Sequence, residues 1–157
     1  MTTAIVATDH LAIARRYAAS LTDWPVAPRF DPHRRWYHRL AALPDGEVWV
    51  LSWLPGQETD LHDHGGSAGA FQVVSGTLTE RTPADRRGSA VRLNSIGYGA
   101  GRGRSFGRQH IHQISNAGTE PAVSVHVYSP VLREMTRYRI AAGRLAVASV
   151  ERAGADW

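Results

Sequence analysis

Short apolar runs, each bounded by glycine, proline, asparagine or aspartate, fill the chain from residue 35 onward. Several runs alternate apolar and polar positions with a period of two, which is typical of half-buried β-strands. Turn residues at Pro44-Asp45-Gly46 and Ser75-Gly76 separate neighbouring runs. We therefore expect strands at residues 36–42, 47–54, 69–75, 77–81, 91–94, 110–115, 122–128, 136–141 and 145–150. This pattern predicts an all-β barrel or jelly roll.

The N-terminal part has a different periodicity. Apolar residues with helical spacing follow Thr8 and Asp9, two residue types that cap helices, and the pattern stops before Trp24-Pro25. We predict one domain over residues 1–157, with a short helix and connection in 1–34 and the barrel core in 35–150. We interpret the glycine-rich segment 97–108 as a loop.

Composition narrows the possible chemistry. The 157 residues are 43% hydrophobic and 20% charged, as in an ordinary globular domain. The chain contains no cysteine, which excludes disulfides, thiolate metal ligands and cysteine nucleophiles. Any bound metal must therefore use histidine and carboxylate ligands. No apolar stretch approaches the length of a bilayer span or a secretory signal, so we expect a cytoplasmic protein that does not enter the membrane.

The net charge of +4 does not point to nucleic acid. All 18 basic residues are arginine, and they are scattered along the chain without the interleaved aromatic residues of a nucleic-acid surface. We therefore predict no nucleic-acid partner. A modest positive field would instead favour small anionic substrates.

Two histidine clusters are the main candidates for chemistry. His62 and His64 are two residues apart, so on a strand their rings share one face. About fifty residues later, His110 or His112 could supply a third imidazole across a barrel. Imidazole ligands suit iron, nickel, copper or zinc. The clusters predict a metal site built on three histidines.

Another expected strand carries a polar row. Ser124, His126 and Tyr128 alternate with three valines, so one face of the strand is polar and the other apolar. Because two histidine clusters lie elsewhere in the barrel, we expect the polar face to line a cavity. We assign Trp53 and Phe71 to core packing, with a wall of that cavity as the alternative.

The spacing of these residues resembles the two motifs of the cupin superfamily. The matching positions are Gly56, His62, His64 and Gly76 in the first motif, and His112 and Asn116 in the second. This resemblance implies a cupin double-stranded β-helix, a jelly-roll barrel, with a short N-terminal helical segment. It also selects His112 over His110 as the third ligand, because asparagine follows His112 by four residues.

A departure from the first motif narrows the resemblance. Gly69 stands where most cupins carry a glutamate ligand. Three histidines without an acid resemble the thiol dioxygenases, specifically the cysteine dioxygenase family. Residues 62–71 and 120–130 are similar to this family almost position by position, and the resemblance covers roughly residues 36–138. Animal enzymes carry at the position of Gly69 a cysteine that crosslinks to the active-site tyrosine, so Tyr128 should remain an ordinary phenol here.

The resemblance implies a role for each candidate residue. His62, His64 and His112 would hold Fe(II), and Ser124, His126 and Tyr128 would form a hydrogen-bonded catalytic relay beside it. Arg39, with Tyr37 and Tyr128, would bind the substrate, because a guanidinium can hold a carboxylate through two parallel hydrogen bonds. Ser129-Pro130 matches a step that is often cis in the family.

The expected reaction is the oxidation of L-cysteine by O2 to cysteine sulfinate. One alternative is a dioxygenase for 3-mercaptopropionate or another small thiol such as homocysteine. A second alternative is a metal-binding cupin without oxygenase activity, either a sensor or an isomerase that uses nickel, manganese or zinc. The expected partners are a small-molecule thiol and O2, with the chain a monomer or a weak homo-oligomer.

Overall fold

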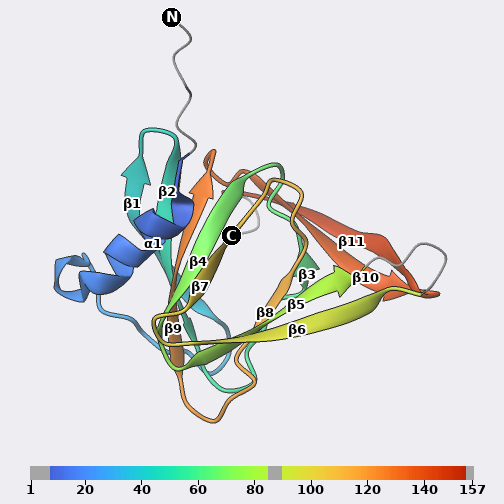
Figure 1. The fold of residues 1–157 in the computed structure, drawn as a ribbon, viewed down its shortest axis with the longest axis horizontal. Helices are drawn as coiled ribbons and strands as arrows, with labels where there is room; N and C mark the ends of the chain where they lie inside the picture. Colours follow the sequence, from blue (N-terminus) through green and yellow to red (C-terminus); the bar gives the residue numbers. More distant parts are fainter. Residues whose placement is uncertain (1–7, 85–89, 155–157) are drawn as a thin grey trace, which may run out of the picture.

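The computed structural model describes residues 8–84 and 90–154, and its strands enclose a common interior (Figure 1). The helical elements are α1 (His10–Ala19) and the 3-10 turn η1 (Leu21–Asp23). The strands are β1 (Trp36–Leu43), β2 (Gly46–Trp53), β3 (Leu61–His62), β4 (Ala68–Ser75), β5 (Thr77–Ala84), β6 (Arg92–Gly99), β7 (Gly103–Phe106), β8 (Gln113–Ser115), β9 (Ala122–Ser129), β10 (Glu134–Ala141) and β11 (Arg144–Arg152). The all-β prediction with one short helix is confirmed. The assignment of a single domain over residues 1–157 stays a prediction.

Three antiparallel sheets form the barrel. The largest has the order β1-β2-β9-β4-β7, and the two smaller sheets have the orders β11-β10-β3 and β6-β5-β8. Strand β9 lies at the centre of the large sheet, where β2 pairs with one edge and β4 with the other. Because the middle of a sheet is its most constrained part, β9 gives side chains on its inner face well-defined positions.

Helix α1 covers the outer face of the large sheet. Asp9 caps the helix, accepting a hydrogen bond of 2.9 Å from the main-chain N–H of Ala12. The buried Ala14 packs in one apolar cluster with Val125 and Val127 of β9, and α1 lies across β4 and β9 (Figure 1). The valines of β9 are thus buried outside the barrel, beneath the helix. The polar residues between them face inward, as the alternation predicts.

A second apolar cluster fills part of the barrel interior. Its fully buried members include Trp53, Phe71, Leu78 and Ile114, which come from strands of two different sheets. This cluster packs around the inner face of β9 without filling it. The remaining space forms the pocket described below.

Two strands were absent from the sequence prediction. β3 has only two residues, and it forms because Arg137 and Tyr138 of β10 pair with His62 and Leu61. The prediction of a loop over residues 97–108 is wrong, since β6 continues to Gly99 and β7 pairs with β4. A Cβ atom at Gly103 would collide with the carbonyl oxygen of Phe71, so glycine permits the close approach of β7 to β4.

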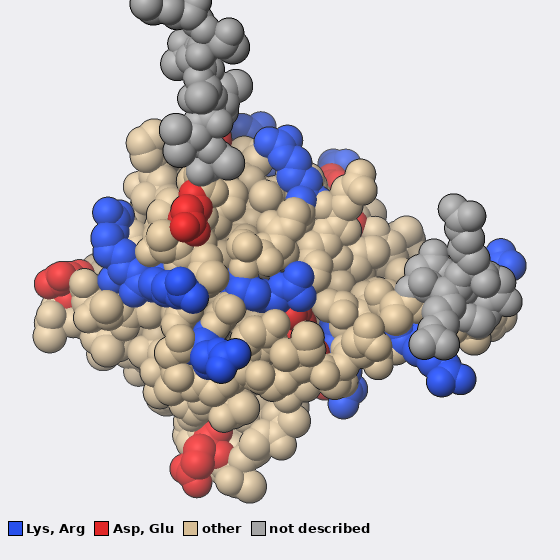
Figure 2. Space-filling model, in the orientation of Figure 1, with Lys and Arg blue, Asp and Glu red and all other residues tan. Residues whose placement is uncertain are grey.

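Arginine side chains are prominent on one face of the molecule. In Figure 2, several of them lie near one another in a band across the left and middle, while other arginines and the acidic groups lie mainly toward the edges. No helix within residues 8–84 and 90–154 has the length and apolar character needed to cross a membrane.

Candidate functional site

The two histidine clusters meet inside the barrel. The main-chain N–H of His62 donates to the carbonyl of His112 over 2.9 Å, and that of His112 donates back to His62 over 3.0 Å. His64 completes a nearly equilateral triangle, with ring centroids 4.8 to 5.0 Å apart. All three side chains are buried, and one nitrogen of each lies within 4.8 Å of the others. The structure therefore brings His62, His64 and His112 together at one point.

The ring nitrogens of this triad fit a bound metal ion. Nδ1 of His62 lies 2.8 Å from the carbonyl of Asp60, and Nδ1 of His112 lies 2.8 Å from Glu80 Oε1, so each ring keeps Nε2 available. Both ring nitrogens of His64 are buried, and neither has a hydrogen-bond partner among residues 8–84 and 90–154. Unpaired buried polar groups are costly, and an ion bound at the shared point would satisfy His64.

The electrostatic environment also keeps these imidazoles neutral. Burial lowers the pKa of His62 and of His64 well below the usual value, and the neighbouring histidines of the triad lower each pKa further. Burial likewise lowers the pKa of His112, although Glu80 opposes that shift. A neutral imidazole carries the lone pair that a metal requires. This donor set suits iron, nickel, copper or zinc.

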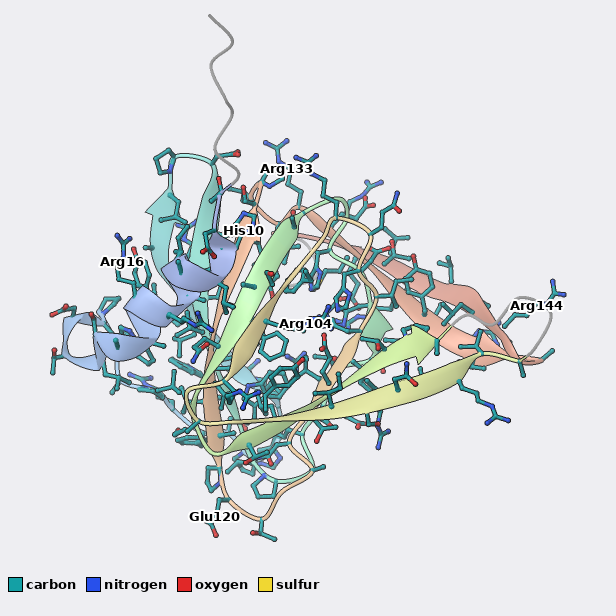
Figure 3. The ribbon with its side chains drawn as sticks, viewed as in Figure 1. His10, Arg16, Arg104, Glu120, Arg133 and Arg144 are labelled. Atoms are coloured by element: carbon teal, nitrogen blue, oxygen red, sulfur yellow. The ribbon has the colours of Figure 1, made fainter. Side chains whose placement is uncertain are left out.

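Glu80 supports His112, the third histidine of the triad. Its carboxylate is 1% exposed and accepts hydrogen bonds from His112 (2.8 Å), His110 (2.9 Å) and Arg104 (3.1 Å). Arg104 lies over the middle of the barrel (Figure 3). Burial raises the pKa of Glu80, but the hydrogen bonds from His110 and His112 outweigh it and hold that pKa well below the usual range. Glu80 is thus an anion that sets the tautomer and orientation of His112.

His110 is not part of the triad. Its Nε2 binds Glu80, and its ring stacks on Phe106 at 5.4 Å. Glu80, His110 and His112 also lie close enough to hold an ion. Their separations of 2.8 and 2.9 Å are those of hydrogen bonds, however, and we interpret the group as a hydrogen-bonded support for His112.

The polar row of β9 forms a connected chain of hydrogen bonds. Trp53 Nε1 donates to Ser124 Oγ over 2.9 Å, and that hydroxyl lies 2.9 Å from His126 Nε2. His126 Nδ1 lies 3.4 Å from the hydroxyl of Tyr128. Burial lowers the pKa of His126 to about 3 and raises that of Tyr128, so both are neutral near pH 7. Trp53 therefore both packs in the core and anchors this row.

A pocket of about 190 Å³ opens beside the triad. Apolar side chains make up much of its wall, and polar groups converge on it from five strands and the segments beside them. The lining residues that carry chemistry are Arg35, Tyr37, His62, His112, His126, Tyr128, Arg137 and Glu151. Such a concave, largely apolar site with a few placed polar groups is typical of a small-molecule pocket.

Arg35 and Arg137 line this pocket, whereas Arg39 does not. Arg39 is exposed and is absent from the pocket lining, whereas Tyr37 lines the mouth and is 41% exposed. Arg39 shares a strand face with Tyr37 and pairs with Trp49, which lines the pocket, but Arg39 itself is not a lining residue. Arg35 lies in the pocket wall, with its guanidinium 5.2 Å from the ring of Trp53. Burial, together with the charge of Arg137, lowers the pKa of Arg35.

Gly69 is packed closely against the site. A Cβ atom there would collide with the carbonyl oxygen of Val127 and lie 2.9 Å from the ring of Phe106. The Phe106 ring in turn stacks on His64 at 4.7 Å and lies 6.4 Å from that of Tyr128. The space beside Tyr128 is therefore occupied by Phe106. The Ser129-Pro130 peptide bond is cis.

Sequence reasoning missed Glu80, Arg35 and Glu151. A signal existed for Glu80, which shares a strand face with the buried Leu78 and so should point inward. The signal for Arg35 was weaker, because it lies one residue before β1 and the alternation of that strand does not assign it to a face. Nothing local marks Glu151, since its place in the pocket depends on the pairing of β11 with β10.

Comparison with known proteins agrees with the resemblance found in the sequence motifs. The family model described as "Cysteine dioxygenase type I" matches residues 2–140. Human cysteine dioxygenase type 1 is 30% identical over 131 residues, which cover 76% of this chain and 62% of the human protein. The zebrafish enzyme is 28% identical over 127 residues, covering 73% and 60%. The chain thus spans about three fifths of the length of these relatives.

Solved structures support the fold. A conserved protein with a double-stranded β-helix domain from Klebsiella pneumoniae has a TM-score of 0.53 and 21% identity, covering 77% of this chain and 90% of that one. A cupin superfamily protein from Desulfitobacterium hafniense has a TM-score of 0.52 and 13% identity, covering 65% and 83%. Both show that the barrel is a cupin double-stranded β-helix. From its fold and its family match over residues 2–140, the chain belongs to the cysteine dioxygenase type I family.

Proposed function

We propose that this protein is an iron-dependent thiol dioxygenase that converts L-cysteine and O2 to cysteine sulfinate. Membership of the cysteine dioxygenase family supports this function. The observation that carries it is a three-histidine cluster beside a pocket that also holds Arg35 and Tyr128. Bound at these histidines, Fe(II) would supply the thiolate coordination and the dioxygen activation that the reaction needs. Both atoms of O2 would be transferred to the sulfur.

Arg35 is the proposed partner of the substrate carboxylate, in place of Arg39. Its guanidinium lines the pocket, and none of the ion pairs among the described residues involves it, so its hydrogen-bond donors are available to a ligand. Contact with Trp53 fixes the orientation of the guanidinium. A carboxylate bound there would hold the substrate with its thiol toward the histidines. Tyr37, at the mouth, would border the bound substrate.

Tyr128 is proposed to donate a hydrogen bond into the pocket. Ser124 is fully buried, and its hydroxyl already accepts from Trp53, whose indole N–H is solely a donor. Among the described residues, His126 Nε2 is the acceptor within reach of the Ser124 hydroxyl hydrogen. His126 then carries its proton on Nδ1 and donates to the Tyr128 oxygen. The Tyr128 hydroxyl hydrogen remains available to the substrate carboxylate or to a reacting oxygen.

The decisive experiment is product analysis with labelled oxygen. The protein is loaded anaerobically with Fe(II), mixed with L-cysteine and exposed to ¹⁸O2, and the product is examined by mass spectrometry. We expect cysteine sulfinate with two labelled atoms, and no product from His112→Ala. Recovery of unchanged cysteine, or of cystine alone, from iron-loaded protein would contradict the proposal.

Parallel reactions distinguish the related activities. Oxygen consumption with 3-mercaptopropionate and homocysteine, compared with L-cysteine, identifies the preferred thiol. Failure with all thiols despite full iron loading would instead favour a metal-binding cupin without oxygenase activity. The buried chain from Trp53 to Tyr128 argues against that alternative, because a simple metal-binding role does not require it.

A further inference from the structure

A second guanidinium lies in the pocket wall, but it is already paired. Arg137 of β10 donates to Glu151 of β11 through Nε (2.5 Å) and through a terminal nitrogen (2.7 Å). The two side chains are 19% and 25% exposed, and both line the pocket. Asp60 is a more distant partner at 3.6 Å, and its side chain is 72% exposed. Such a two-point ion pair in a partly buried place has a defined geometry.

The two arginines of the pocket therefore differ in availability. Arg35 has no carboxylate within ion-pair distance among the described residues, whereas both donor edges used by Arg137 are taken by Glu151. The two cations are also close enough to interact, since the charge of Arg137 contributes to lowering the pKa of Arg35. Without Glu151, the pocket would present two guanidinium groups to a ligand instead of one.

We propose that Glu151 is a specificity-determining residue, which holds Arg137 in an ion pair and so restricts the pocket to thiols that carry a single carboxylate. This inference rests on the proposed thiol-binding function and adds the substrate class. A thiol with two carboxylates would find Arg35 for one of them and the carboxylate of Glu151 near the other. Bringing two like charges together in a partly desolvated pocket is unfavourable.

Glu151 lies in the last strand of the chain, outside the region that matches the family model. The family match ends at residue 140, within β10, and Glu151 lies in β11 beyond it. The register places Glu151 beside Met135, and the preceding strand carries Arg137 to the level of His62. The terminal hairpin thus brings a carboxylate to a pocket whose other chemistry comes from the matched region.

The test compares two thiols that differ by one carboxylate. Mercaptosuccinate is 3-mercaptopropionate with a second carboxylate on the carbon that bears sulfur. Their dissociation constants are measured by calorimetry, anaerobically, on Fe(II)-loaded protein. We expect the wild type to bind 3-mercaptopropionate more tightly, and Glu151→Gln to shift the ratio of the two constants toward mercaptosuccinate by about tenfold. That change corresponds to one additional charge-assisted hydrogen bond of ordinary strength.

Glu134→Gln is the matched control. Glu134 lies on the same hairpin and pairs with Arg152 at 3.9 Å, but it does not line the pocket. This control should leave the ratio unchanged. The double variant with Glu151→Gln and Arg137→Gln should lose the gain, because the gain requires the released guanidinium. Arg137→Gln alone should move the ratio in the opposite direction, since it leaves Glu151 unpaired. That variant also tests the inference if Glu151→Gln does not fold.

An unchanged ratio in Glu151→Gln, an equal shift in Glu134→Gln, or a gain that survives in the double variant would overturn the inference. Absence of binding by both thiols in every variant would overturn it as well. Failure of the proposed function is a separate result. If thiols bind with the expected ratios while the wild type yields no labelled sulfinate, the specificity role stands and the dioxygenase proposal does not.

Discussion

The two ends of the pocket are built in different ways. At the metal end, main-chain hydrogen bonds join His62 to His112, and the buried Glu80 holds the latter ring. At the other end, long side chains reach in from three separate strands or their ends, and Tyr37 is 41% exposed. The backbone therefore determines where a metal would bind, whereas individual side chains determine which ligand is admitted. Substitutions at the two ends should affect different measurable quantities.

Removing a histidine of the triad should have the largest effect. His112→Ala deletes one of three proposed ligands, so we expect loss of stoichiometric iron and a fall in turnover of at least about 1,000-fold. Metal content by mass spectrometry and oxygen consumption measure the two effects. His33→Ala, at an exposed position outside the pocket, is the control and should behave as wild type. Full iron retention in His112→Ala would rule out the ligand assignment.

Replacing Glu80 by a neutral residue should lower the affinity for iron, but less than removal of a triad histidine does. Glu80→Gln removes the anion that accepts from His112 Nδ1, and we expect iron affinity to fall about 10- to 100-fold. Competition with a chelator measures this affinity without any turnover. The exposed Glu58 offers a control, since Glu58→Gln should leave iron binding unchanged. Equal affinities in the two variants would show that Glu80 does not support the site.

The proposed carboxylate site is tested by substituting Arg35 and Arg39 separately. Arg35→Gln should raise KM for L-cysteine about 10-fold or more, because a buried charge-assisted contact is lost, while iron content stays at the wild-type level. Arg39→Gln should change neither quantity, because its side chain lies outside the pocket. Cysteamine, which lacks the carboxylate, should be insensitive to both substitutions. A larger effect from Arg39 than from Arg35 would reverse our placement of the carboxylate.

The smallest expected effect is the pH dependence of folding stability that arises from the buried His126. Burial lowers the pKa of His126 to about 3 from 6.5, so below about pH 6.5 the unfolded chain binds a proton that the folded chain does not. Stability should therefore fall as pH falls. For this one group the loss between about pH 7.5 and pH 5.5 is about 1.4 kcal/mol.

Urea denaturation of the metal-free protein at these two pH values measures the free energy of unfolding. The wild type should lose about 1.4 kcal/mol more than His126→Gln over this interval, because the variant lacks that titrating group. An identical pH dependence in both proteins would contradict a neutral, buried His126.

Periodicity predicted the positions of nine strands and the helix because apolar alternation and capping are local properties. It missed β3, which exists through its pairing with β10, and β7, a four-residue strand in which Phe106 is the one large apolar residue. The three histidines proposed as metal ligands were predictable as candidates from their spacing, although His64 lies just beyond β3 rather than on the strand. The partner of the third ligand, Glu80, was missed because its contact with His112 joins residues 32 positions apart.

The sequence by itself determined that this chain is an all-β protein of the cysteine dioxygenase family with histidines spaced to meet. It also determined that Ser124, His126 and Tyr128 share one strand face. Tertiary structure decided which of two nearby arginines enters the pocket, and that Glu151 neutralises Arg137. Alternation along a strand assigns a residue to a face, but not to the inside of a pocket. That choice depends on where the strand passes the rim and on what its neighbours bring to the same place.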